Sequence, residues 1–401
     1  MSYNLVWFYS ANYIAHQQVG CSLEFSNFEA KITTARKGDR TKERALPYEI
    51  DFLRPGDSSG DAIIMRWGET KDGPFYINII DGGFTDTGDQ IIEHVEKHYA
   101  KSAKIANVVL SHADNDHAPG LIKVLEHSNF TISNLWMNKP WDYVDEVIDS
   151  FHGAYTREGL IKKMREMHPY LVEMEKIANK RGITINAPLQ GAKIGPFTVL
   201  APSRQRYIKL IPDLDKTPTS YASASKGVLG SLFKAAADVT EKVLESLGYE
   251  TLDDNPPATT ASNETSVVQW ACFGDKRILL TADVGPEGLA EAADYAEQIS
   301  LQIQPTLAQI PHHGSRRNVT PTVLNRWLGK YPAEHRGHAI ASVGKNADIY
   351  PRRKVANAFT RRGYEVYATH DGWINFVHEY DRRSGMKDAD VIPFSPDVED
   401  D

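Results

Sequence analysis

The stretch 111–117 reads Ser-His-Ala-Asp-Asn-Asp-His and places four metal-type side chains, His112, Asp114, Asp116 and His117, within six positions. An apolar run at 105–110 precedes it, which predicts a buried strand that ends in a tight loop. Two imidazoles and two carboxylates packed this closely desolvate and repel one another unless a positive charge lies among them. The stretch therefore predicts a site for divalent metal ions, with a metal pair as the simplest arrangement, and makes hydrolysis the leading hypothesis.

The overall composition is that of an ordinary folded protein. With 401 residues, 41% hydrophobic and 24% charged, the chain is long enough to bury a large core. The formal net charge of −8 argues against a broad, nonspecific nucleic-acid surface. Basic groups at 316–317, 352–354 and 361–362 leave two interpretations open, a local basic groove or ordinary solvated faces.

Nothing in the sequence predicts association with a membrane. No apolar run approaches the length that spans a bilayer, and the stretch 1–14 has neither a basic n-region nor a small-residue cleavage site. Cys21 and Cys272 are too few for a disulfide framework and are expected to be buried thiols in a reducing compartment. We therefore expect a cytoplasmic protein.

The order of patterns divides the chain into an extension, a large α/β unit and a tail. Residues 1–45 form an N-terminal extension without an assignable role, and residues 46–380 alternate predicted strands and helices, which indicates a layered α/β architecture. Residues 203–262 interrupt this alternation with prolines, a Ser/Ala-rich stretch and one amphipathic helix near 229–247. They are expected to be an insertion that acts as a lid or a partner surface. The polar, acidic tail 381–401 is expected to fray.

Polar clusters follow several predicted strands of the α/β unit, at the point where each strand ends. Asp81-Gly82-Gly83 follows the apolar run 77–80, Asp283 follows 278–281, and His312-His313-Gly314-Ser315 follows 307–310. Residues 342–346, Ser-Val-Gly-Lys-Asn, end another strand. Because α/β folds build their sites from loops at strand ends, these clusters predict one site shared with the 111–117 loop.

Together these residues resemble the metallo-β-lactamase superfamily, whose signature His-x-His-x-Asp-His appears here as His112-x-Asp114-x-Asp116-His117. An aspartate in the second ligand place is typical of one branch, the metallo-β-lactamase domain of the ComEC/Rec2 competence proteins and their stand-alone relatives. The other motifs of that branch follow in order over about 50–380: Gly60-Asp61-Ala62, Asp81-Gly82-Gly83, Asn263-x-x-Ser266, Leu280-Thr281-Ala282-Asp283, Pro311-His312-His313-Gly314-Ser315, Ser342-Val343-Gly344 and Asp371-Gly372. The resemblance implies an α/β fold, a metallo-β-lactamase four-layer αβ/βα sandwich with helical insertions, and a dinuclear metal site at one edge of two facing sheets.

The resemblance also implies roles for the clustered side chains. Asp283 is expected to be shared by two ions, one held with the 116–117 pair and a histidine of the 312–313 pair, and the other with His112 and Asp114. Only one histidine of the 312–313 pair needs to bind metal. His312, nearest the strand end, is the expected ligand, and His313 is expected to contact substrate or to pack. The expected metal ligands are His112, Asp114, Asp116, His117, Asp283 and His312, and the expected catalytic residues are Asp116, Asp283 and His313.

Further residues are expected around these ligands. Asp81 either caps the next helix or supports the ligands from behind. The family often has His-Pro after the Ser-Val-Gly loop, where this chain has Tyr350-Pro351. Either the function of that histidine is lost in this chain, or Tyr350 or Arg352 supplies it. The expected substrate-binding residues are Asn263, Ser266, Ser315, Lys345 and Arg352.

The ligand set determines which metals are expected. It is poorer in imidazole and richer in oxygen than that of the lactamases; oxygen ligands suit Mn²⁺ or Mg²⁺, whereas imidazole suits Zn²⁺. We expect two divalent ions, with Mn²⁺ competing with Zn²⁺, and with Mg²⁺ as a further candidate. Two such ions lower the pKa of a bridging water to about 7 and clamp the attacking and leaving oxygens, which suits phosphodiester cleavage.

The leading hypothesis is a metal-dependent hydrolase, a phosphodiesterase or nuclease that uses a metal-bridging hydroxide and acts on DNA or RNA. Basic residues near 316–317 and 352–353 would orient the phosphate. Two alternatives stay open. One is hydrolysis of a small-molecule ester, lactone or amide, which a closed apolar pocket would favour. The other is an effector subunit of a defence or repair system that needs a protein partner, docked through 1–45 or 203–262.

Overall fold

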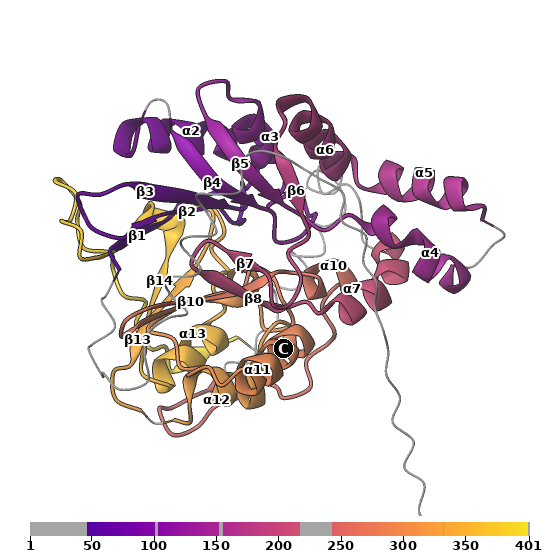
Figure 1. Cartoon of the computed structure of the whole chain (residues 1–401). Coiled ribbons are helices and arrows are strands. Elements are labelled where there is room, and N and C mark those ends of the chain that lie inside the picture. The colour runs from indigo at the N-terminus through magenta and orange to yellow at the C-terminus, as the bar shows by residue number, and fades with distance from the viewer. Residues whose placement is uncertain (1–45, 101–102, 152–154, 217–242, 332, 400–401) are drawn as a thin grey trace, which may run out of the picture. The chain divides into compact units, whose positions relative to one another are not determined.

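The computed structural model describes residues 46–100, 103–151, 155–216, 243–331 and 333–399. These residues form two seven-stranded sheets that face each other, and helices cover the outer side of each sheet (Figure 1). The sheets touch directly, because the ring centroids of Tyr48 in one and Phe273 in the other lie 4.6 Å apart. The four-layer αβ/βα sandwich that the sequence predicts is therefore confirmed.

The first sheet carries the 111–117 loop. Its pairing is antiparallel among the first four strands and parallel among the last four. Parallel neighbours need crossover connections, and α2 (Thr85–His98) and α3 (Pro119–Glu126) supply two of them. The strand order is β15 (Ile374–His378), β1 (Tyr48–Phe52), β2 (Ile63–Gly68), β3 (Phe75–Ile80), β4 (Lys104–Val109), β5 (Thr131–Trp136) and β6 (Thr184–Asn186).

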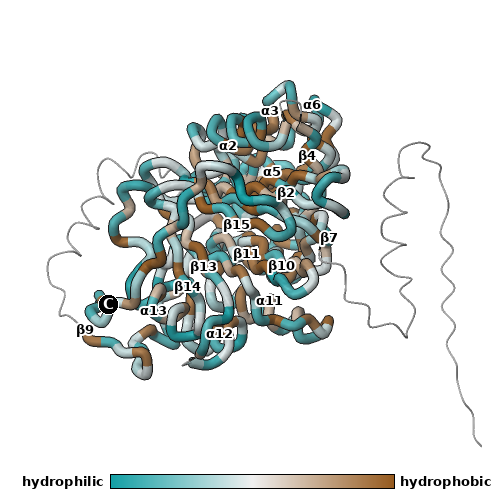
Figure 2. The backbone as a smooth tube through the Cα atoms, turned by 90° about the vertical axis from the view of Figure 1, so that its left-hand side faces the viewer, coloured by the Kyte–Doolittle hydropathy of each residue, from teal (hydrophilic) through white to brown (hydrophobic). Residues whose placement is uncertain are grey.

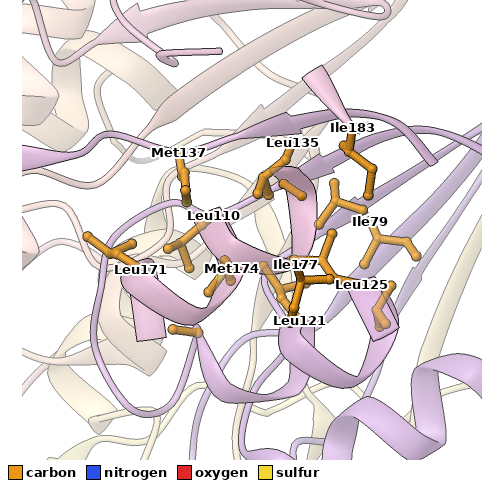
Figure 3. Close-up of a cluster of buried hydrophobic side chains, with 14 of the residues drawn as sticks. Ile79, Leu110, Leu121, Leu125, Leu135, Met137, Leu171, Met174, Ile177 and Ile183 are labelled. Atoms are coloured by element: carbon orange, nitrogen blue, oxygen red, sulfur yellow. The ribbon is translucent and has the colours of Figure 1, made fainter. Parts of the chain in front are cut away.

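A hydrophobic core fixes the helices on this sheet (Figure 3). Leu121 and Leu125 of α3 and Ile177 of α6 (Pro169–Arg181) point toward Ile79 and Leu135 of the strands, and all five are buried. The four-residue spacing in α3 places both leucines on one face of the helix. Burial of each such side chain stabilises the fold by roughly 1.5–3 kcal/mol. The outer turns of α2 are mostly hydrophilic (Figure 2).

The second sheet carries the other strand-end clusters. Its strands from β11 to β14 are parallel, and β11, β10, β8 and β7 are antiparallel. Its helices are α11 (Pro286–Gln298), α12 (Pro321–Leu328) and α13 (Arg353–Arg361). The strand order is β14 (Tyr364–Ala368), β13 (Gly337–Ala341), β12 (Leu307–Gln309), β11 (Lys276–Leu280), β10 (Val268–Phe273), β8 (Phe197–Ala201) and β7 (Lys193–Ile194).

Several helices lie in the long connections between strands of the same sheet. Between β5 and β6 lie η1 (Pro140–Tyr143), α4 (Val144–Val147), η2 (Ile148–Ser150), α5 (Arg157–Met167) and α6. The described helices of the predicted insertion are α7 (Arg204–Leu210), η3 (Ile211–Lys216) and α10 (Ala261–Glu264), and α7 contacts α4 (Figure 1). The extension 1–45 and most of the predicted helix 229–247 lie outside the described residues and stay predictions.

Two predictions are wrong, one about the end of the predicted helix 229–247 and one about the tail 381–401. The predicted helix 229–247 does not extend to its end, because β9 (Val243–Leu244) pairs there with β16 (Asp397–Val398). The tail 381–401 does not fray at this point either, since the side chain of Val398 is buried. The pairing gives both short segments backbone partners that the sequence alone does not reveal.

Buried ion pairs reinforce this contact. Arg361 and Arg362, expected on a solvated face or in a basic groove, are completely buried. Arg361 lies 2.9 Å from Glu245, and Arg362 lies 2.8 Å from Glu250. Because an unpaired buried charge costs several kcal/mol, each guanidinium needs its carboxylate, and the pairs fasten the segment 245–250 to α13.

Among the described residues, no helix combines the length and the apolar character needed to cross a membrane.

Cys272, expected to be buried, is exposed. It lies near the end of β10, paired with Arg277 of β11, where the alternation of the strand turns its side chain outward. Cys21 lies outside the described residues.

A buried carboxylate organises one edge of the first sheet. Asp51 on β1 accepts hydrogen bonds from His94 Nε2 at 3.0 Å, Tyr99 Oη at 2.6 Å and Arg383 Nη2 at 2.8 Å. Burial alone raises the pKa of Asp51, but the hydrogen bonds and charges of His94 and Arg383 outweigh burial and lower the pKa to about 2. The ionised carboxylate therefore fastens the segment after β15 to the sheet.

This network predicts an acid-sensitive contribution to stability. Because the folded pKa of Asp51 lies below its unfolded value, the contribution is present above about pH 4 and is lost as the pH falls toward 2. Between about pH 5 and pH 2.5, we expect the free energy of unfolding to fall more steeply for wild type than for Asp51→Asn, by on the order of 2 kcal/mol. Urea titrations of both proteins measure the difference, and equal pH slopes would contradict it.

Candidate metal centre

The predicted ligands come from loops at the carboxyl ends of parallel strands in both sheets. The 111–117 loop connects β4 to α3, and Asp283 lies between β11 and α11. The turn η4 (Pro311–Gly314), which holds His312 and His313, follows β12. The two sheets meet here, because His313 Nε2 lies 3.4 Å from Asp116 Oδ2. The fold thus gathers side chains that lie far apart in the sequence.

Asp283 lies at the centre of this cluster and is buried. Its Oδ1 is 3.4 Å from His117 Nε2 and 3.8 Å from His313 Nε2. Its Oδ2 is 3.9 Å from His112 Nε2 and 3.5 Å from His312 Nε2. Each carboxylate oxygen therefore faces its own pair of imidazoles, which gives the centre two halves.

We call these halves the inner and the outer subsite. The inner subsite comprises Asp116, His117, Asp283 Oδ1 and His313, and the outer subsite comprises His112, Asp114, Asp283 Oδ2 and His312. In the inner subsite one ligand atom from each of the four side chains lies within 4.8 Å of all the others. In the outer subsite His112 Nε2 lies 3.6 Å from Asp114 Oδ2. The His312 side chain is 30% exposed and that of His313 only 5%.

The charges of the carboxylates act on the buried imidazoles. Burial alone lowers the pKa of His313, but the charges of Asp283 and Asp116 outweigh burial and raise the pKa to about 9. The pKa of His117 is likewise raised well above its usual value against burial, chiefly by Asp283 and Asp116. Without another cation, protons on the imidazoles balance the carboxylates. A divalent cation would replace those protons.

Unsatisfied polar atoms test whether the site fits a metal. Within the described residues, the buried Nε2 atoms of His112 and His117 and the buried Oδ1 of Asp283 make no hydrogen bond. Each buried polar atom left in this state costs about 1–3 kcal/mol. The three atoms converge, and imidazole nitrogen and carboxylate oxygen are ordinary ligands of Zn²⁺ and Mn²⁺. The donor set therefore fits divalent cations.

The Nδ1 atoms of three histidines, on the side of the ring away from the centre, contact other polar side chains. Asp81 Oδ2 lies 2.9 Å from His117 Nδ1 and also accepts the hydroxyl of Ser111 at 2.6 Å, which agrees with a supporting place behind the ligands. Ser266 Oγ lies 3.3 Å from His112 Nδ1, and Asn263 Nδ2 lies 3.1 Å from His312 Nδ1. Asn263 and Ser266, predicted to bind substrate, are thus buried behind the histidines and support the imidazoles.

The double histidine adopts an unusual backbone. His312 and His313 have φ angles of 47° and 57°, in the left-handed region that non-glycine residues rarely occupy. Two consecutive residues of this kind are held by the surrounding chain, in which His312 N donates to Ala282 O at 3.0 Å. The turn sends neighbouring imidazoles to opposite sides of Asp283. Both imidazoles face the shared carboxylate, and the expectation that only one of the pair, His312, needs to bind metal stays a prediction.

Sequence reasoning assigned no role to two residues that join the sheets under the centre. Asp61 Oδ2 accepts Gln309 Nε2 at 2.8 Å, and Gln309 Oε1 accepts the backbone N–H groups of Thr281 and Ala282, both at 2.9 Å. Asp61 N donates to the carbonyl of Asp116 at 3.1 Å. Asp61 lies in a recognised motif, but Gln309 lies within an apolar strand and gives no signal of its own.

The remaining predicted substrate residues lie around the double-histidine turn. Ser315 is buried, and its hydroxyl accepts from Arg317 N at 3.3 Å. Arg352 is partly exposed, with its backbone N donating to Gly314 O at 3.1 Å and its guanidinium 5.5 Å from the ring of Tyr350. Lys345 is exposed, and its backbone N donates to Gly56 O at 2.9 Å.

No protein-family model matches the chain. A curated relative, the uncharacterized protein YcaI of Escherichia coli K12, is 31% identical over 138 residues, which cover 33% of this chain and 16% of that protein. The matched part is thus a small fraction of the relative.

Solved structures with a similar arrangement include the metallo-β-lactamase fold protein YhfI from Bacillus subtilis, 11% identical, with a TM-score of 0.36 over 83% of this chain and 100% of YhfI. Unliganded yeast PDE1 is 11% identical, with a TM-score of 0.39 over 82% of this chain and 99% of PDE1. Because both TM-scores are low, these structures give no information about the reaction of this chain. The sandwich itself is defined by the sheet order given above.

The support of His117 by Asp81 predicts a loss of metal affinity on substitution. Asp81→Asn removes the charge behind His117, and we expect the affinity for Mn²⁺ or Zn²⁺ to fall by about 10–100-fold. Titration calorimetry on metal-free protein measures this change. Asp51→Asn is the matched control, because it neutralises another buried aspartate at the sheet edge described above. Equal affinities of Asp81→Asn and wild type would contradict the assigned role.

Proposed function

We propose that this chain is a metal-dependent hydrolase and that its substrate is a phosphodiester. The observation that carries the proposal is the place of Asp283, whose two oxygens face separate imidazole pairs at 3.4–3.9 Å. One carboxylate whose oxygens face two subsites can serve a pair of divalent cations. Pairs of cations are the usual device for in-line displacement at phosphorus.

The proposed ligands are three carboxylates and four imidazoles. Asp116, His117 and His313 would hold one ion and His112, Asp114 and His312 the other, with Asp283 shared. When bound, the ions supply the Lewis acid and the activated water that phosphodiester hydrolysis needs. Because carboxylate oxygen suits Mn²⁺ and imidazole suits Zn²⁺, this mixed set supports either ion, with Mg²⁺ as a weaker candidate.

The chain's own residues would hold and orient the substrate. Arg317 is exposed and lies shortly after the double-histidine turn, and the backbone N–H of Arg352 donates a hydrogen bond to that turn. Guanidinium groups pair well with phosphate oxygens. These residues support a phosphate position beside the double-histidine turn, despite the overall charge of −8. Whether the phosphodiester belongs to DNA or RNA stays a prediction, as does the ComEC/Rec2-like branch.

The second candidate is hydrolysis of a small-molecule ester, lactone or amide, which a closed apolar pocket would favour. The hollow beside His112 gives it little support, because Leu110, Leu171 and Leu214 share its lining with polar residues, among them Ser111, Asn138, His168 and Ser262. The third hypothesis, a partner-dependent effector, rests on segments that lie mostly outside the described residues.

An assay on metal-loaded protein tests the proposal. With Mn²⁺ we expect cleavage of bis-p-nitrophenyl phosphate and of DNA or RNA, and we expect Asp283→Asn to lower the rate by roughly three orders of magnitude, because several kcal/mol of transition-state stabilisation depends on the shared carboxylate. Asp145→Asn, an exposed aspartate of α4, is the control. A metal-loaded protein that leaves every phosphodiester intact but opens lactones would overturn the phosphodiester assignment.

A further inference from the structure

The imidazole of His312 presents one nitrogen to the centre and the other to two asparagines. Its Nε2 lies 3.5 Å from Asp283 Oδ2, whereas its Nδ1 lies 2.9 Å from Asn318 Oδ1 and 3.1 Å from Asn263 Nδ2. A neutral imidazole carries hydrogen on one nitrogen and a lone pair on the other. The partner of Nδ1 therefore decides whether Nε2 can bind a cation.

The orientation of Asn318 is fixed by its surroundings. Its side chain is completely buried, and Nδ2 donates to the carbonyl of Asp283 at 2.7 Å and to that of Val284 at 3.3 Å. Both carbonyls only accept hydrogen bonds, so the NH₂ group must point to them. The amide oxygen therefore faces His312 Nδ1 and accepts its hydrogen. The lone pair of His312 is then on Nε2, on the side of Asp283.

Asn263 can adapt to this arrangement. Its Nδ2 lies 2.8 Å from the hydroxyl of Thr259, and a hydroxyl both donates and accepts. Turning the Asn263 amide by 180° presents its oxygen to His312 Nδ1 and keeps a hydrogen bond to Thr259. The tautomer of His312 is consequently set by Asn318, whose orientation cannot change without leaving the Asp283 and Val284 carbonyls unsatisfied.

Asn318 thus holds two members of the outer subsite at once. It orients the ring of His312 and donates a hydrogen bond to the backbone carbonyl of Asp283, the residue that both subsites share. The inner subsite is built differently, because a carboxylate, Asp81, stands behind His117 at 2.9 Å. A neutral amide increases the electron density of an imidazole ligand less than a carboxylate does.

We propose that Asn318 is a positioning residue that assigns His312 to the outer subsite as its second imidazole and so sets how tightly that subsite holds a divalent cation. The proposal rests on the metal centre of the proposed function but does not depend on the substrate. It accounts for both histidines of the 312–313 pair, one in each subsite.

The test is a titration of metal-free protein with Mn²⁺, with bound metal counted by mass spectrometry. Wild type is expected to bind two ions per chain. Asn318→Leu, close in size but without polar atoms, is expected to keep the inner ion and to bind the outer one about 10–100-fold more weakly. Asn318→Asp keeps an oxygen that accepts from His312 Nδ1 but loses the hydrogen bonds to the Asp283 and Val284 carbonyls. It is expected to bind the outer ion more tightly than Asn318→Leu does and less tightly than wild type.

Two control variants separate this role from general packing. Asn357→Leu makes the same change at another buried asparagine, which lies on α13 and contacts Glu245 and Ser395. This variant is expected to bind both ions as wild type does. Asn263→Ala removes the other contact to His312 Nδ1, which does not set the tautomer, and is expected to weaken binding of the outer ion less than Asn318→Leu does. If Asn318→Leu does not fold, Asn318→Ala takes its place, and wild-type affinity for the outer ion in that variant would overturn the proposal.

Proton NMR of the Co²⁺-loaded protein gives a second readout. An imidazole that binds through Nε2 shows a strongly shifted Nδ1–H resonance that exchanges with water. Wild type is expected to show such a signal from His312, and Asn318→Leu is expected to lose it while the signal from His117 persists. An Asn318→Leu protein that binds two ions with wild-type affinities would refute the assignment. A wild type that binds two ions but cleaves no phosphodiester would refute only the substrate.

Discussion

The shared carboxylate of Asp283 is the interaction on which the centre depends. One side chain faces two imidazole pairs, so its position fixes both subsites and the relation between them. A carboxylate can serve both sides only if its own backbone is held from outside. Gln309 accepts the two N–H groups just before it, and Asn318 donates to its carbonyl. The polar residues beneath the centre therefore shape the site without facing its interior.

The sandwich provides this support because its two sheets end at the same place. Asp61, in a loop of the first sheet, joins the sheets by accepting Gln309 Nε2, and it donates its backbone N–H to the carbonyl of Asp116 in a neighbouring loop. Close approach is essential, since a Cβ atom on Gly60 would lie 2.5 Å from the carbonyl oxygen of Asp116. The glycine before Asp61 is thus explained by packing of one loop on another, and it places the Asp116 loop within reach of the second sheet.

The sequence was sufficient to predict the layered fold and the residues that meet at its edge, because carboxylates and imidazoles at strand ends have few other uses. It could not divide His312 and His313 between two subsites, since that division depends on left-handed backbone and on Asn318. Gln309 lies in an apolar strand and was not predicted. Arg361 and Arg362 were predicted at the surface because their partners, Glu245 and Glu250, lie 116 and 112 residues away along the chain.

The distance along the chain between the two halves of the inner subsite has a consequence for the whole molecule. His313 and Asp116 are separated by 197 residues and belong to different sheets. An ion held by both ties the sandwich together much as a covalent cross-link would, and the unfolded chain has no equivalent site. Above the dissociation constant, every tenfold rise in free ion adds about 1.4 kcal/mol per site to the folded state. The fraction of folded protein would then depend on the concentration of free metal ions, independently of any reaction that the protein performs.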